Sequence, residues 1–199
     1  MPVLYHASPS PYSAKVRMAA AYLNVALELQ SVATAEPPAE LLSANPLGKI
    51  PTLVLDNGFG IFDSRSIMLE IDRLSGKKLY PRKSEKRRLV ERLEAAGDGL
   101  SDVLVAQVYE RRYRPEEKVH QGWLDKQAEK AARSFDWLEA NLIPVRGKLN
   151  GGQFAVAAAL SYSDLRFPDN NWRRGRPKLK RFEQRFGEAF TQYGALKSI

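Results

Sequence analysis

The sequence changes its pattern near residue 80, and this change limits the folds that the chain can adopt. Before that point, short β-prone runs alternate with helical ones; after it, apolar residues recur at helical spacing over long stretches. The charge changes at the same place, since residues 1–80 hold seven basic and seven acidic groups, whereas residues 81–199 hold 24 and 16. We therefore predict an α/β domain over residues 1–77, a linker over 78–83 and an all-helical domain over 84–199.

The first part predicts the element order βαβαββα. Strands are indicated by β-prone runs, helices by apolar stripes with capping residues, and the last two strands are joined by an Asp-Asn-Gly turn. The predicted elements are, in order, a strand at 2–5, a helix with an apolar stripe at 16–23, a strand at 26–32, a short helix at 37–43, strands at 52–55 and 59–62, and a helix that begins at Asp63 or Ser64 and ends at Ser75-Gly76.

The second part predicts helices throughout. Asn150 and Gln153 have the spacing of a capping box, which indicates the start of a buried helix. The tail beyond Gly187 gives little signal. Apolar residues at helical spacing predict helices over 89–108, 124–142, 154–160 and, more weakly, 177–186, of which the first two are expected to be antiparallel.

The chain contains no cysteine and only two histidines, His6 and His120. Disulfides, thiolate zinc sites and a cysteine nucleophile are therefore excluded, and we expect neither a metal site nor a prosthetic group. No apolar run approaches the roughly 18 residues of a membrane-spanning helix, and the first residues lack the layout of a signal peptide. We expect a cytoplasmic protein that is not anchored in a membrane.

Three local sequences resemble motifs of one enzyme family: residues 8–17 (SPSPYSAKVR), 45–53 (NPLGKIPTL) and 62–67 (FDSRSI). They resemble the first active loop, the cis-proline segment and the glutamyl-binding turn of the cytosolic glutathione transferase superfamily. Residues 160–169 are similar to a bacterial, serine-type branch of it. The resemblance implies a thioredoxin-like domain followed by an all-helical glutathione-transferase domain. One departure is Asn150 with Gln153, where the family usually has Ser or Thr with Asp.

Ser10 is the predicted catalytic residue. A loop that delivers Ser10 to the start of a helix places a hydroxyl donor beside free backbone N–H groups, and such a place favours anions. The resemblance implies that Ser10, seven residues before Arg17, donates a hydrogen bond to the glutathione sulfur and does not itself attack. From this segment alone, helix capping is the simpler interpretation, and the other two motifs favour the catalytic one. Tyr5 and Ser8 are the alternative donors.

Five further residues are predicted to bind glutathione. The resemblance implies that Pro51 is cis and aims the backbone N–H and C=O of Ile50 at the cysteinyl unit, and that Lys49 meets the glycyl carboxylate. Ser64 would bind the α-carboxylate of the γ-glutamyl end, and Asp63 its ammonium group. Each has a structural alternative: Pro51 could open an edge strand, Lys49 could only be solvated, and Asp63 and Ser64 could form an ordinary N-cap.

The pocket for the electrophile is predicted from the helical part. Family members bind the electrophile between the first loop and the first two helices of the second domain, which points to Tyr109, Arg112, Tyr113 and Trp123. The alternative is that these aromatic residues belong to the core. Arg and Tyr together would suit an anionic aromatic acceptor.

The predicted function is that of a glutathione transferase that conjugates glutathione to a small aromatic or hydrophobic electrophile. Because the first loop has no cysteine, a glutathionyl-enzyme disulfide is not expected. The family resemblance implies a homodimer. The alternative is a non-catalytic interaction protein that binds a protein or nucleic acid through residues 173–185, which hold seven basic groups and one acidic group. A solvated helix face explains that stretch more simply, so nucleic acid is not the expected partner.

Overall fold

The N-terminal part of the chain forms a mixed four-stranded sheet. A computed structural model describes residues 1–199, and its strands have the order β2-β1-β3-β4. The first two strands are parallel, and the last two are each antiparallel to their neighbour. This is the thioredoxin-like arrangement that the family resemblance implies, and its element order is the predicted βαβαββα. The strands are β1 (Val3–His6), β2 (Glu28–Ser31), β3 (Thr52–Val54) and β4 (Gly60–Ile61).

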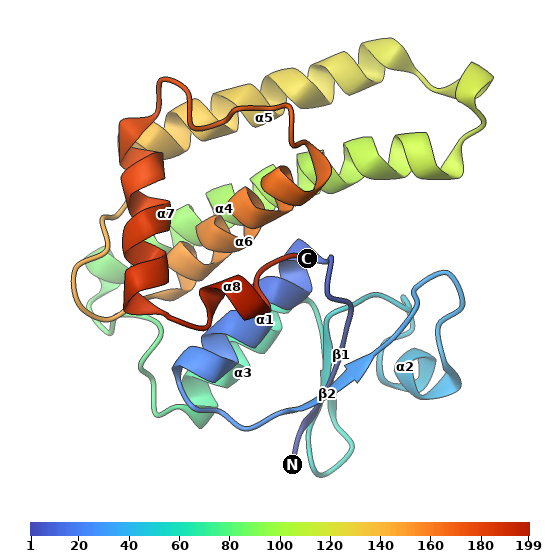
Figure 1. Cartoon of the computed structure of the whole chain (residues 1–199). Coiled ribbons are helices and arrows are strands. Elements are labelled where there is room, and N and C mark those ends of the chain that lie inside the picture. Colours follow the sequence, from blue (N-terminus) through green and yellow to red (C-terminus); the bar gives the residue numbers. More distant parts are fainter.

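Three helices complete this part: α1 (Pro11–Tyr22), α2 (Ala39–Ala44) and α3 (Ser64–Leu74). Figure 1 shows α1 and α3 side by side between the sheet and the helices of the second part. Nearly all of α1 is buried because it packs against α3 on one side and against the second part on the other. The N-terminal end of α1, where Ser10 is the N-cap, therefore lies at the junction of the two parts.

The second part is all-helical, as predicted. Its two longest helices form an antiparallel hairpin that a short 3₁₀ turn closes (Figure 1). The tail forms a short helix, α8, that the sequence pattern does not predict. The elements are α4 (Ser84–Tyr113), η1 (Glu116–Lys118), α5 (Gln121–Asn141), α6 (Gly151–Arg166), α7 (Pro177–Ala189) and α8 (Tyr193–Leu196).

Helix α6 is the centre of the second part, and its first 13 residues are all buried. The predicted capping box is confirmed: Asn150 Oδ1 accepts from the Gln153 N–H at 3.2 Å, and Gln153 Oε1 accepts from the Asn150 N–H at 3.1 Å. Gly97 of α4 crosses α6 so closely that a Cβ there would lie 2.7 Å from the Ala155 carbonyl carbon. This close approach fixes the position of α4 and hence of the residues that α4 presents to the first part.

One apolar cluster of 33 buried residues includes side chains from both parts, so the sheet and the helices pack as one body. None of the helices combines the length and the apolar character that crossing a membrane would require.

Candidate active site

A cavity of about 640 Å³ opens between the two parts of the chain. Its first wall comes from the N-terminal ends of α1 and α3 and from the loop before β3, and its second wall comes from α4 and α6. The cavity brings together nine of the ten residues that the sequence predicts for the site: Ser10, Lys49, Ile50, Pro51, Asp63, Ser64, Tyr109, Arg112 and Tyr113.

The tenth residue, Trp123, does not line the cavity. It lies in the first turn of α5, where its backbone N–H donates to His120 Nδ1 at 2.9 Å. Figure 1 shows that α5 lies outside α4, away from the first part. The alternative donors Tyr5 and Ser8 do not line the cavity either. Tyr5 is buried in β1, and the Ser8 carbonyl accepts from Arg17.

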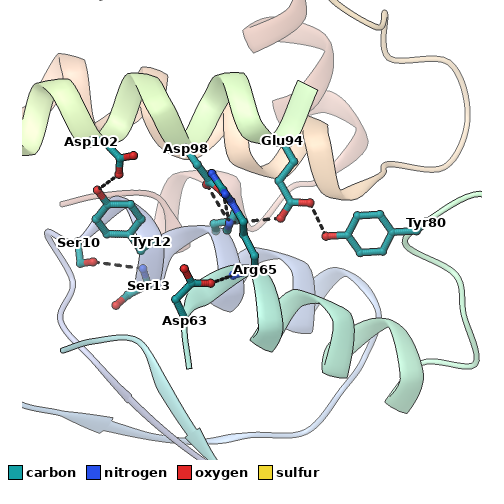
Figure 2. Close-up of polar contacts among 10 residues, drawn as sticks. Ser10, Tyr12, Ser13, Asp63, Arg65, Tyr80, Glu94, Asp98 and Asp102 are labelled. Atoms are coloured by element: carbon teal, nitrogen blue, oxygen red, sulfur yellow. Dashed lines mark hydrogen bonds and ion pairs between the residues drawn. The ribbon is translucent and has the colours of Figure 1, made fainter. Parts of the chain in front are cut away.

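Ser10 caps α1 and faces the cavity. Its Oγ accepts a hydrogen bond from the Ser13 N–H at 3.2 Å (Figure 2). A hydroxyl has two lone pairs and one hydrogen, so the cap leaves the Ser10 hydrogen available to another acceptor. Helix capping and donation to an anion, which the sequence leaves as alternatives, are therefore compatible at this position.

The segment before β3 is held in place by buried side chains. Asn45 Nδ2 donates to the Lys49 carbonyl and to Thr52 Oγ1, both at 3.0 Å, and the Ile50–Pro51 bond is cis, as the resemblance implies. Ile50 makes no backbone hydrogen bond within the chain. The cavity therefore has an unpaired backbone edge at Ile50, which an extended peptide could join.

Asp63 and Ser64 stand at the start of α3 and line the same wall. Asp63 Oδ1 accepts from the Arg65 N–H at 2.9 Å, which makes Asp63 the N-cap, and the buried Ser64 is the first helical residue. A helix N-terminus with a free hydroxyl favours a carboxylate. The Asp63 cap uses one carboxylate oxygen and leaves the other to the cavity.

A buried ionic cluster behind the cavity joins α1 and α3 to α4, and the sequence analysis missed it. Lys15, which is 1% exposed, places Nζ 2.8 Å from Asp98 Oδ1 and 3.3 Å from Glu94 Oε1. Arg65 Nε donates to Asp98 Oδ2 at 2.9 Å, and the Tyr80 hydroxyl donates to Glu94 Oε2 at 2.6 Å (Figure 2). Burial raises the pKa of Tyr80, and the charge of Glu94 raises it further. Both buried carboxylates are thus satisfied by donors from other elements.

Tyr12 makes a second link across the junction. Its hydroxyl donates to Asp102 Oδ1 at 2.6 Å, and both residues line the cavity. Burial raises the pKa of Tyr12, and the hydrogen bond to Asp102 adds to this effect, so the phenol stays protonated at neutral pH. The only available sequence signal for these links was the presence of three acidic residues at helical spacing, 94, 98 and 102, beside an apolar stripe.

The second wall of the cavity is aromatic and basic. The rings of Tyr109 and Tyr113 meet edge to face with centroids 5.2 Å apart, and both side chains are exposed. Arg112 lies between them in sequence. Tyr162 and Arg166 of α6 complete this wall. The sequence does not predict them as site residues, because Tyr162 belongs to an apolar helix whose pattern indicates a core position.

The basic stretch 173–185 is partly engaged within the chain. Arg173 pairs with Asp164 and Glu183, Arg176 pairs with Asp136, and Arg185 pairs with Glu188. These pairs reduce the free positive charge of this stretch, so the structure adds no support to a nucleic-acid or protein partner at this surface.

Comparison with known proteins identifies the family. The profile of "Glutathione S-transferase, N-terminal domain" matches residues 4–79. An Escherichia coli (strain K12) protein described as the uncharacterized GST-like protein YibF is 34% identical over 139 residues, which is 68% of each chain. Among solved structures, a glutathione S-transferase from Methylobacillus flagellatus KT with GSH bound is 29% identical over all of both chains, with a TM-score of 0.92.

Two structures of a glutathione transferase family member from Pseudomonas fluorescens Pf-5 are also similar. One has bound glutathione and is 33% identical over all of both chains, with a TM-score of 0.91. The other has bound S-(propanoic acid)-glutathione and is 33% identical over 97% of this chain and 98% of that one, with a TM-score of 0.85. The chain described here therefore belongs to the glutathione S-transferase family. Its place in a serine-type branch stays a prediction.

Proposed function

We propose that the protein binds glutathione in the cavity, stabilises its thiolate with Ser10 and conjugates it to a small aromatic or hydrophobic electrophile. One observation carries this proposal. The Ser10 hydroxyl, the unpaired Ile50 backbone and the N-terminus of α3 come from three distant segments and line one cavity. The relatives with bound glutathione support the choice of ligand.

Glutathione would lie along the first wall. Its cysteinyl unit would pair with the Ile50 backbone, its γ-glutamyl carboxylate with Ser64 and its ammonium group with Asp63, while Lys49 would meet the glycyl carboxylate. This orientation places the sulfur near Ser10 at the N-terminal end of α1.

The chemical role of Ser10 follows from the pKa of a thiol. A free thiol has a pKa near 8.5 and is mostly protonated at neutral pH, and each unit of lowering corresponds to about 1.4 kcal/mol. One charge-assisted hydrogen bond, together with a helix N-terminus, can supply that amount. The thiolate then forms a carbon–sulfur bond with the electrophile, the leaving group departs with its electron pair, and the thiol proton goes to solvent.

The organisation of the whole protein is part of the proposal. We propose a glutathione-binding domain over residues 1–77, a linker over 78–83 and an acceptor-binding domain over 84–199, in a cytoplasmic homodimer as is usual in the family. The acceptor would contact Tyr109, Arg112 and Tyr113. The predicted contact of Trp123 with the acceptor has no support, because Trp123 does not line the cavity.

Calorimetric titration with glutathione tests the proposal, and Ser10→Ala tests the assignment of the donor. We expect Ser10→Ala to retain glutathione binding, because the tripeptide keeps its other contacts. The pKa of the bound thiol, followed by the ultraviolet absorbance of the thiolate, should rise by about one unit or more, and conjugation should fall at least roughly tenfold. Ser8→Ala and Tyr5→Phe serve as controls, in which the pKa of the bound thiol and the rate of conjugation should stay as in the wild type. Unchanged conjugation in Ser10→Ala would move the role to Tyr5 or Ser8, and the absence of any heat with glutathione would overturn the function itself.

A further inference from the structure

The second wall of the cavity holds positive charge that the chain does not neutralise. Arg112 of α4 and Arg166 of α6 both line the cavity, and neither forms an ion pair with a carboxylate. Nε of Arg166 is buried and has no hydrogen-bond partner. Two guanidinium groups from different helices therefore line one cavity, and neither has an ion-pair partner.

The acidic residues of the cavity are already engaged. Asp98 pairs with Lys15 and Arg65, Asp102 accepts from Tyr12, and Asp63 caps α3. Asp98 and Asp102 belong to the α4 part of the second wall, but neither forms an ion pair with Arg112 or Arg166, so the positive charge of these two arginines is left for a ligand.

Three tyrosines lie beside these arginines in the wall: Tyr109 and Tyr113 of α4 and Tyr162 of α6. Burial raises the pKa of Tyr162, although the charges of Arg166 and Arg112 oppose this effect, so the phenol stays neutral. Tyr109 and Tyr113 present exposed aromatic edges beside Arg112. The wall thus offers two cations, phenol donors and ring surface together.

A buried guanidinium nitrogen without a partner is unfavourable, because burial removes its hydration and nothing replaces it. An anionic group on the ligand would supply the missing acceptor through a charge-assisted hydrogen bond. Glutathione itself does not account for the two cations, since its carboxylates are assigned to Lys49 and Ser64 on the first wall.

We infer that the electrophile of this enzyme carries an anionic group, a carboxylate on an aromatic or unsaturated frame, which Arg166 and Arg112 bind while its electrophilic carbon faces the sulfur near Ser10. This inference rests on the proposed function and specifies its substrate class.

Two matched conjugates test the inference by binding alone. S-carboxymethylglutathione and S-carbamoylmethylglutathione have nearly the same shape, but only the first carries an additional negative charge. We expect calorimetry to show that the carboxymethyl conjugate binds the wild-type protein roughly tenfold more tightly, or better, as one or two charge-assisted hydrogen bonds would give. In Arg166→Gln and in Arg112→Gln the ratio of the two conjugate affinities should fall toward one, while the affinity for glutathione stays unchanged.

Arg111→Gln is the matched control. Arg111 precedes Arg112 on α4, is exposed and does not line the cavity, so its loss should leave the preference intact. A kinetic comparison of a chloronitrobenzoate with the corresponding chloronitrobenzamide, each normalised to its uncatalysed rate, should show the same pattern. In this reaction sulfur bonds to the ring carbon, chloride leaves with its electron pair and the thiol proton goes to solvent.

The outcomes separate the inference from the function on which it rests. Glutathione binding with equal affinities for the two conjugates would overturn the inference alone, and so would a preference that both arginine variants retain. If neither glutathione nor either conjugate binds, the proposed function fails and the inference fails with it. Folding of each variant is checked by its glutathione affinity, which does not depend on the second wall.

Discussion

Single side chains at this site have atoms for folding and for binding at once, because the capping contact occupies only some of their polar atoms. Ser10 Oγ accepts from the backbone of α1 while its hydrogen stays free, and Asp63 uses Oδ1 for the cap of α3 while Oδ2 stays free. The sequence could predict both residues, since capping and anion binding favour the same residue types at a helix start. It could not decide between the two roles, and the geometry is compatible with both.

Asp63 allows the two roles to be separated. Asn caps helices about as well as Asp does, so we expect Asp63→Asn to keep the free energy of unfolding within about 0.5 kcal/mol of wild type, whereas Asp63→Ala should lose about 1 kcal/mol. Both variants remove the negative charge that is proposed to bind the ammonium group of glutathione. Both should therefore weaken glutathione binding by roughly tenfold.

Urea unfolding measures the first quantity and calorimetry the second. Wild-type glutathione affinity in Asp63→Asn would show that the residue is a cap and nothing more. Equal stability of the Asn and Ala variants would instead show that the hydrogen bond to the Arg65 N–H contributes little to folding.

At the scale of elements, the apolar stripes predict the helices well, because burial on one face determines their periodicity. The stripe over 89–108 lies within α4, and the predicted capping box begins α6. The same pattern does not reveal what each face contacts. Glu94 and Asp98 find their partner Lys15 about 80 positions away, and no local signal encodes a pairing at that distance. This buried ionic contact between the two parts was therefore not predictable.

Lys15→Met tests how far this cluster holds the two parts together. The substitution keeps the aliphatic bulk of the side chain but leaves the Glu94 and Asp98 carboxylates buried with fewer donors. Removing one partner of a buried ion pair costs about 3 to 5 kcal/mol, and we expect a loss of that size in the free energy of unfolding, measured with urea.

Two comparisons bracket this effect. Arg65→Gln removes a partner that is 54% exposed, so its loss should be nearer about 1 kcal/mol. Arg133→Gln breaks an exposed pair with Glu129 on one helix and should change stability by less than about 0.5 kcal/mol. A Lys15→Met loss no larger than that of Arg133→Gln would mean that the Lys15 ion pairs contribute little to joining the two parts.

At the scale of the whole molecule, the last residues of the chain pack against the loop that carries Ser10. The Ile199 N–H donates to the Ser8 carbonyl at 3.4 Å, and Arg17 Nη2 donates to the carbonyls of Ser8 and Lys197 at 3.2 and 3.4 Å. Figure 1 shows the C-terminal end beside the start of α1. The tail gives little sequence signal because α8 has only four residues. The contacts of the tail are two buried aromatic rings, Phe190 and Tyr193, and single hydrogen bonds to distant groups, which leave no periodic pattern.

His6 makes this junction sensitive to acid. It is buried beside Arg17, and its Nδ1 has no hydrogen-bond partner. Burial lowers the pKa of His6, and the positive charge of Arg17 lowers it further. The unfolded chain, with a His pKa of about 6.5, therefore binds this proton more readily than the folded protein does. The His6 contribution to stability is complete above that value and is lost as the pH falls below it toward the folded pKa.

We accordingly expect the free energy of unfolding to fall between about pH 7.5 and about pH 5.5, with a His6 contribution of at most about 1.4 kcal/mol per pH unit. In His6→Gln this part of the slope should disappear, while carboxylates that titrate in the same range affect both proteins alike. Urea unfolding at several pH values measures the difference between the two slopes. Parallel curves for the two proteins would mean that His6 takes up a proton in the folded state as easily as in the unfolded one, and that the junction of tail, β1 and α1 tolerates a second positive charge beside Arg17.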